Sequence, residues 1–177
     1  LDTGLRAEPR VRYFVMGGRE GRPPADLEHT LWHGGRWETA AVWPPPNYAK
    51  TPYYLHADGS LQTEQPSGTA APTRYTYDPL DPVPTAGGSI SASEDLLPSG
   101  GFDQRGQPGR FFGHVDQLSI ASRPDVISFE TAPLDSDVEI AGPVEVLLFA
   151  ASSTLDTDFT AKLLDVYPHD RDVAGST

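Results

Sequence analysis

The stretch "DVEIAGPVEVLLFAASSTLDTDFTAKLLDVYP", residues 137–168, decides the fold class of this chain. Apolar and polar side chains alternate in it over short runs, which is the period of a β-strand. Gly142 and Pro143 interrupt the first run, and an acidic turn separates it from the second run at 158–168. Proline is tolerated where a strand starts or at the edge of a sheet. This stretch therefore predicts neighbouring strands and no helix.

The rest of the chain follows the same pattern. Strands are predicted at 11–16, 73–79 and 125–131, and a hairpin at 51–61 with Asp58 and Gly59 in its turn. The strand at 11–16 is apolar on both faces, so we expect it to be covered on both sides. The sequence has 17 glycines and 18 prolines and no convincing amphipathic helix. It therefore predicts an all-β sandwich or barrel.

Charge and composition exclude several classes of partner. The chain has 13 basic and 25 acidic residues, a net charge of −12, so we expect neither nucleic acid nor an anionic membrane to bind it. It has no cysteine, hence no disulfide and no thiolate metal site. Neither a signal peptide nor a membrane span is visible. A cytoplasmic location is favoured, with secretion as the alternative.

The segment 78–124 is a long stretch rich in proline and glycine. Structureless loops of this length are uncommon inside compact domains. Disorder, a functional lid and an arm that lies on another domain are the three interpretations. The run "FFGHVDQL" within it is too apolar for free disorder, so the arm is favoured.

Candidate nucleophiles and metal ligands are weak. No G-x-S-x-G pentapeptide is present, and Ser152 and Ser153 sit where serine commonly satisfies local backbone groups. His29 and His33 are four residues apart, but adjoining glycines and the lack of acidic neighbours make a metal site there unconvincing. Four acidic residues could bind calcium, but turn chemistry explains them better; they are Asp135, Asp137, Asp156 and Asp158.

The three tryptophans of the chain, Trp32, Trp37 and Trp43, have two interpretations. They fill a core or an interface between domains, which is the ordinary role of large aromatic side chains, or they form a sugar-binding platform. The residues alone therefore describe an all-β domain in which no catalytic, cofactor-binding or metal-binding residue can be assigned.

Three runs in order, "PRVRYFVMGG", "YTYDPLDPVPTAGG" and "RPDVISFETAPLDSDVEIAGPVEVLLFAASSTLDTDFTAKLLDVYP", resemble the C-terminal part of the CocE/NonD hydrolases. This group of cocaine-esterase relatives overlaps the X-Pro dipeptidyl-peptidase C-terminal domain and includes α-amino-acid ester hydrolases. The resemblance implies a jelly-roll β-sandwich, like a galactose-binding domain, that occupies residues 1–177. It also implies that a Ser-His-Asp triad lies upstream, on an α/β-hydrolase domain of the same protein.

By this resemblance the chain is a fragment, incomplete at its C-terminus, and is itself without a catalytic triad. The arm at 78–124 would pack on the missing catalytic domain, with interdomain contacts from Asp78, Asp81, Asp103 and Gln104. The leading hypothesis is a non-catalytic sandwich of a serine hydrolase that cleaves ester or amide bonds. A carbohydrate-binding jelly roll is the alternative, and a domain that drives homo-oligomer assembly is a third class.

Overall fold

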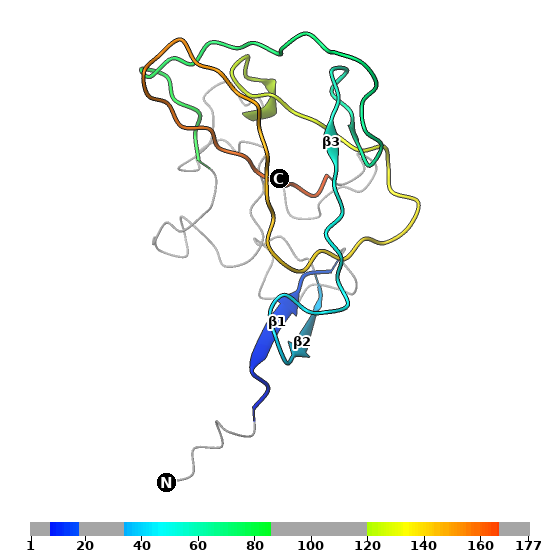
Figure 1. Ribbon diagram of the computed structural model, residues 1–177. Coiled ribbons are helices and arrows are strands. Elements are labelled where there is room, and N and C mark those ends of the chain that lie inside the picture. Colours follow the sequence, from blue (N-terminus) through cyan, green and yellow to red (C-terminus); the bar gives the residue numbers. More distant parts are fainter. Residues whose placement is uncertain (1–7, 18–33, 86–119, 167–177) are drawn as a thin grey trace, which may run out of the picture.

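The computed structural model describes residues 8–17, 34–85 and 120–166 (Figure 1). These residues form four short strands joined by coil. One short 3-10 helix, η2 (Ile120–Ser122), is present, and no α-helix occurs in these three ranges. The all-β class predicted from the sequence is confirmed.

The first hairpin lies near the N-terminal end of the molecule (Figure 1). Strand β1 (Val11–Val15) pairs antiparallel with β2 (Arg36–Ala40), and Phe14 stands opposite Trp37. The valines and aromatic residues of β1 fit a pleated, half-buried surface, as the sequence predicts. Strand β2 was not predicted, because its sequence RWETA lacks a clear apolar alternation.

The second hairpin forms where the sequence places it. Strands β3 (Tyr54–Leu55) and β4 (Leu61–Gln62) pair antiparallel across the predicted turn. Gly59 adopts a φ of 85°, which a residue with a side chain rarely reaches. Asp58 closes the turn by accepting hydrogen bonds at one carboxylate oxygen from the Ser60 amide (3.0 Å) and the Ser60 hydroxyl (2.7 Å).

The predicted strand at 125–131 meets this hairpin at one position. Ser60 and Glu130 form a parallel bridge, in which the Leu61 amide donates to the Glu130 carbonyl (2.7 Å) and the Glu130 amide donates to the Gly59 carbonyl (3.0 Å). Residues separated by about 70 positions in the sequence are thereby joined into one sheet-like contact.

The runs at 73–79, 138–151 and 158–166 do not form strands in the structure. Period-2 patterning identifies which side chains share a face, but it does not supply the neighbouring strand whose amides and carbonyls complete a ladder. Within the described residues no backbone ladder joins these three runs to a neighbouring segment. Leu147 and Phe149 consequently stand 82% and 98% exposed.

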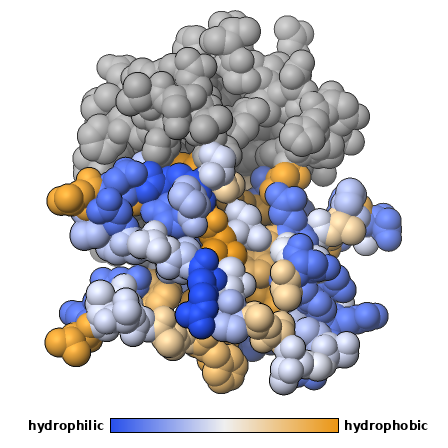
Figure 2. All heavy atoms as spheres, turned by 90° about the horizontal axis from the view of Figure 1, so that it is seen from above, coloured by the Kyte–Doolittle hydropathy of each residue, from blue (hydrophilic) through white to orange (hydrophobic). Residues whose placement is uncertain are grey.

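The described part of the chain has little hydrophobic core. Two of its hydrophobic side chains are buried, Val15 and Ile120, and Figure 2 shows apolar residues reaching the surface between polar ones. Many large hydrophobic side chains of the described part are exposed, among them Leu80, Leu147 and Phe149.

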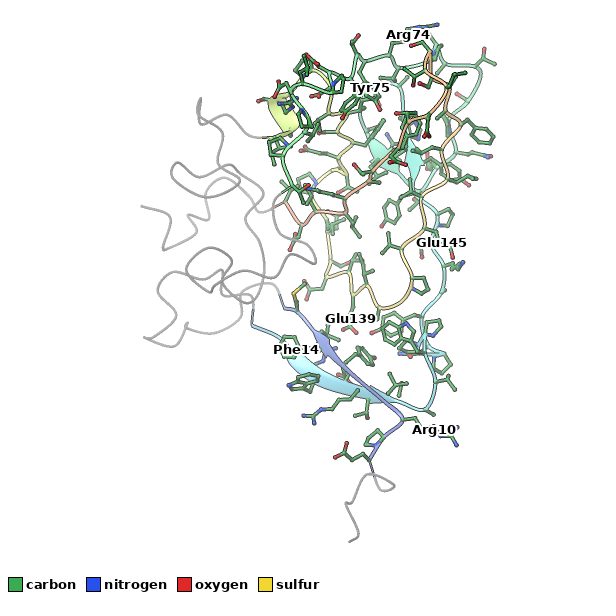
Figure 3. The ribbon with its side chains drawn as sticks, turned by 90° about the vertical axis from the view of Figure 1, so that its left-hand side faces the viewer. Arg10, Phe14, Arg74, Tyr75, Glu139 and Glu145 are labelled. Carbon is green, nitrogen blue, oxygen red and sulfur yellow. The ribbon has the colours of Figure 1, made fainter. Side chains whose placement is uncertain are left out.

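Ion pairs connect the hairpin end of the molecule to residues far along the chain. The guanidinium of Arg36 donates to a carboxylate oxygen of Glu139 (2.5 Å), and the ammonium of Lys50 pairs with Glu145 (2.6 Å). Glu139 lies close to the first hairpin in Figure 3, and Glu145 lies further from it. These side chains are largely exposed, so each ion pair contributes little to stability. The pairs nevertheless show that the segment around 36–50 lies next to the segment around 139–145.

Gly35, which has a φ of 115° immediately before β2, supplies a test of the first hairpin. A methyl group there would collide with the Val15 carbonyl oxygen and approach Phe14 Cε1 to 2.9 Å. We expect Gly35→Ala to lower the free energy of unfolding by about 1–3 kcal/mol, measured by urea unfolding followed by tryptophan fluorescence. Gly68→Ala is the matched control, since Gly68 also has a positive φ (80°) but nothing within 4 Å. Equal losses in the two variants would show that the close approach in the hairpin does not matter.

Candidate functional site

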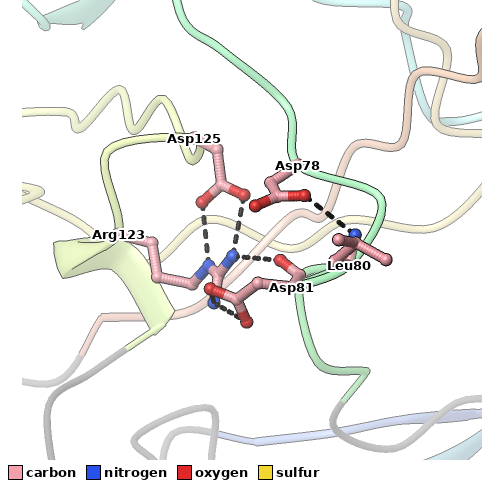
Figure 4. Close-up of polar contacts among 5 residues, drawn as sticks. All are labelled: Asp78, Leu80, Asp81, Arg123 and Asp125. Atoms are coloured by element: carbon pink, nitrogen blue, oxygen red, sulfur yellow. Dashed lines mark hydrogen bonds and ion pairs between the residues drawn. The ribbon is translucent and has the colours of Figure 1, made fainter.

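The most developed polar cluster of the described residues surrounds Arg123 (Figure 4). Its guanidinium grips Asp125 with two hydrogen bonds, from Nε to Oδ1 and from Nη2 to Oδ2, each 2.8 Å long. It also reaches Asp81, where Nη2 donates to the backbone carbonyl (2.6 Å) and Nη1 to the carboxylate (3.2 and 3.3 Å). Arg123 therefore joins two segments that are 42 residues apart in the sequence.

Local hydrogen bonds form a turn in each of the two segments that Arg123 joins. The Arg123 amide donates to the Ile120 carbonyl at the end of η2, and the Val126 amide donates to the Arg123 carbonyl. On the other side, Asp78 caps its own turn by accepting a hydrogen bond from the Leu80 amide (2.9 Å). Two turns, each stabilised within itself, are thus held together by one guanidinium.

The environment of the cluster favours its charged form. The side chain of Arg123 is 12% exposed and that of Asp125 is 5% exposed. Hydrogen bonding from Arg123 lowers the pKa of Asp125 below its usual value, although burial acts in the opposite direction. Hydrogen bonds to Asp125 and then Asp81 raise the pKa of Arg123. Neither group exchanges a proton near neutral pH, so the cluster is a structural clamp and not an acid–base pair.

The predicted interdomain residues divide into two groups. Asp78 and Asp81 lie in the described part, at the clamp. Asp103 and Gln104 lie outside the described residues. The carboxylate of Asp81 is 73% exposed even though it pairs with Arg123, so it retains an open side toward a partner. The interdomain role of these four residues stays a prediction.

Ser152 is engaged in a local turn. Its hydroxyl accepts a hydrogen bond from the Thr154 amide (3.1 Å) and shares a second with the Thr154 hydroxyl (2.8 Å), which itself donates to the Asp156 carbonyl. His56, the histidine within the described residues, has its Nε2 bound to the Glu64 carbonyl (2.9 Å). Neither Ser152 nor Ser153 has a hydrogen bond to a histidine there, so the structure assembles no hydrolase triad from them.

The four candidate calcium ligands, which lie in the described residues, are not brought together as a metal site. Within residues 8–17, 34–85 and 120–166, no group of three or more histidine, cysteine, aspartate or glutamate side chains is arranged to hold a metal ion. The four aspartates considered for calcium lie in this part of the chain; they are Asp135, Asp137, Asp156 and Asp158. His29 and His33 fall outside the described residues.

Two of the tryptophans lie on opposite faces of the first hairpin. Trp37 packs edge-to-face on Phe14, with ring centroids 5.4 Å apart, whereas Trp43 packs edge-to-face on Tyr13 at 5.2 Å. Tyr13 and Phe14 are neighbours in a strand, so their side chains point to opposite faces. Trp37 and Trp43 therefore do not share one sugar-binding platform, and Trp32 falls outside the described residues.

The role of Arg123 was not predicted from the sequence, although the residues around it favour a turn with a local ion pair. The tripeptide Arg-Pro-Asp at 123–125 places opposite charges two residues apart around a proline, which favours a turn. What the sequence does not show is the third member, Asp81, because that contact depends on the tertiary fold.

Comparison with known families gives a match over nearly the whole chain. Residues 3–176 match the model of the X-Pro dipeptidyl-peptidase C-terminal non-catalytic domain. The chain belongs to this family. The clamp and the turn of Ser152 are accordingly features of a C-terminal, non-catalytic domain.

Relatives of this C-terminal domain are esterases by name. The chain is similar to a cocaine esterase of Rhodococcus sp., at 38% identity over 98% of the chain and 28% of the relative. It is also similar to proteins assigned as serine esterases in Mycobacterium bovis and Mycobacterium tuberculosis, each at 30% identity over 96% of the chain and 22% of the relative. The chain thus spans about a quarter of the length of these relatives.

Two further findings concern solved structures and membrane-spanning helices. No solved structure gives a significant match to the chain. No helix in the described residues is both long and apolar enough to cross a membrane.

The clamp predicts an acid-dependent loss of stability. Because the pKa of Asp125 is lowered by folding, the unfolded chain takes up this proton first as the pH falls, and protonation then favours unfolding. The stabilisation is present above the usual aspartate pKa and is lost below it. We expect Asp125→Asn to flatten the decline of unfolding free energy from about pH 5 towards about pH 2, measured by urea unfolding at each pH.

Glu145→Gln is the matched control for this variant, since it removes a carboxylate whose ion pair with Lys50 is exposed on both sides. It should leave most of the acid-dependent decline in place. An Asp125→Asn protein with the same pH profile as the unsubstituted protein would contradict the clamp.

Proposed function

We propose that this chain is the non-catalytic β-sandwich of a serine hydrolase of the esterase or X-Pro dipeptidyl-peptidase type. The observation that carries the proposal is the family match over residues 3–176, together with relatives that are named as esterases. The hydrolytic triad belongs to an α/β-hydrolase domain of the same polypeptide. In that domain a serine attacks the acyl carbon of an ester or amide, a histidine takes its proton, and an aspartate orients the histidine.

The proposed role of the chain is to support this catalytic domain. Its uncovered apolar side chains favour such a role, because apolar surface of this extent is normally buried against a partner. The domain would stabilise the catalytic domain and form one wall of the substrate cleft. It would adopt a jelly-roll sandwich over residues 1–177, and it functions in the cytoplasm or, as the alternative, after secretion.

The arm at 78–124 is part of the same proposal. Asp81 stands at its beginning and Arg123 at its end, and the hydrogen bonds between them hold its two ends together. A clamp at the base of a long excursion limits the directions in which it can extend. The arm would thereby be presented to the catalytic domain from a fixed origin.

An assay on the separated chain tests the proposal. We expect the 177-residue chain to release no nitrophenol from p-nitrophenyl acetate above the rate of buffer, whereas the full-length polypeptide that carries it hydrolyses the ester. A Ser152→Ala variant of the full-length protein should retain its turnover, because Ser152 serves a local turn. Turnover by the separated chain that can be titrated with a serine-directed inhibitor would refute the proposed role.

A further inference from the structure

The turn of the second hairpin contains the single Asp-Gly pair of the sequence, Asp58–Gly59. In such a pair the glycine nitrogen can attack the carboxyl carbon of the aspartate, because glycine has no side chain that hinders the approach. A bond forms between the Gly59 nitrogen and the Asp58 Cγ, and a hydroxyl group leaves Cγ with the amide proton as water. A water molecule from the solvent then opens the cyclic imide. Attack at Cγ restores aspartate, whereas attack at the backbone carbonyl carbon leaves isoaspartate.

Both reacting groups are engaged in the folded turn. The Gly59 amide donates to the His56 carbonyl (3.0 Å), so its proton is less readily removed. One carboxylate oxygen of Asp58 accepts hydrogen bonds from the Ser60 amide (3.0 Å) and the Ser60 hydroxyl (2.7 Å). These bonds lower the pKa of Asp58 and thereby favour the ionised carboxylate, whose oxygen leaves less readily than the hydroxyl group of the neutral acid.

A residue far along the chain restrains the same turn. The Gly59 carbonyl accepts a hydrogen bond from the Glu130 amide (3.0 Å), and the Leu61 amide donates to the Glu130 carbonyl (2.7 Å). Ring closure fixes the backbone and side-chain torsion angles of Asp58, and it removes the amide proton that Gly59 donates to His56. The reaction is therefore coupled to local opening of the hairpin, which costs free energy in the folded protein.

We infer that Asp58 is an isoaspartate-forming site of this chain and that Ser60 controls the reaction, by holding the carboxylate while the hairpin is closed. Isoaspartate adds a methylene carbon to the main chain at the tip of the turn and places the carboxylate directly on the α-carbon. The pairing of β3 with β4 and the bridge between Ser60 and Glu130 depend on the length of this turn. Isomerisation would therefore loosen the contact between the hairpin and the segment that contains Glu130.

A comparison of folded and unfolded protein tests the site. The full-length polypeptide that carries this chain is incubated at neutral pH, either folded or in guanidinium chloride. Isoaspartate at Asp58 is then quantified by mass spectrometry with electron-transfer fragmentation. We expect Asp58 to isomerise in both samples, several-fold more slowly in the folded protein. As isoaspartate accumulates in the folded protein, hydrogen exchange of the peptide that contains Glu130 should become faster.

Matched variants identify the role of Ser60. Ser60→Ala removes the hydroxyl that binds Asp58, so it should raise the rate in the folded protein several-fold and leave the rate in the unfolded protein unchanged. Ser60→Thr retains a hydroxyl and should keep the slow rate. Gln62→Ala is the control, because it removes a hydrogen bond from Gln62 to the Ser60 hydroxyl (2.6 Å) but leaves both groups of Ser60 that bind Asp58. It should change the rate less than Ser60→Ala does.

Three outcomes would overturn the role of this turn: equal rates in the folded and unfolded protein, no isoaspartate at Asp58 in either sample, or equal rates in the folded Ser60→Ala and Gln62→Ala variants. Circular dichroism establishes that each variant is folded. If Ser60→Ala is not, Ser60→Cys takes its place, since a thiol is a weaker hydrogen-bond donor than a hydroxyl.

Discussion

The free energy of the protein in water falls when apolar side chains are buried. In the described residues many such side chains nevertheless stay in contact with water. Val15 and Ile120 are buried, whereas Leu147, Phe149 and Trp37 are not. At about 25 cal/mol per Å² of apolar surface, a single uncovered aromatic side chain represents a sizeable unrealised stabilisation. The strands of the described part form where a neighbouring segment completes a backbone ladder, even where side chains such as Trp37 in β2 stay exposed.

In place of a large hydrophobic core, polar contacts join segments that are distant in the sequence. Arg36 with Glu139 and Lys50 with Glu145 connect distant segments, but both pairs are exposed and water competes for them. The clamp of Arg123 differs, because its bidentate bond to Asp125 is shielded from solvent. It is therefore the contact whose loss would most disturb the relation between the segment that ends at Asp81 and the segment that begins at η2.

Local features of the fold could be predicted from the sequence, and non-local ones could not. The turn at Asp58 and Gly59 is encoded by residues that favour it, and the structure contains it. Strand β1 was equally visible. Strand β2 was missed because its short polar sequence becomes a strand only when β1 lies beside it. The runs at 138–151 and 158–166 show the converse case, in which a strand pattern is present but no described neighbour completes the ladder.

The same reasoning applies to the candidate site. Asp78 and Asp81 were identified through a family resemblance, and the structure places both at the clamp. Arg123, the partner of Asp81, was missed, because a pairing across 42 residues leaves no periodic trace in the sequence. The local turn of Ser152 agrees with its sequence context, since serine commonly bonds nearby backbone groups in a turn.

The expectation that β1 is covered on both sides agrees with the burial of Val15 on one face, and for the other face it stays a prediction. Alternating strands with one apolar face are typical of sheets that expose the other face to water. The second face carries Phe14 of β1 and Met16, which directly follows the strand. A sequence apolar on both faces is appropriate for a strand between two layers. Any second layer has to accommodate the guanidinium of Arg12, which is held over the ring of Trp37.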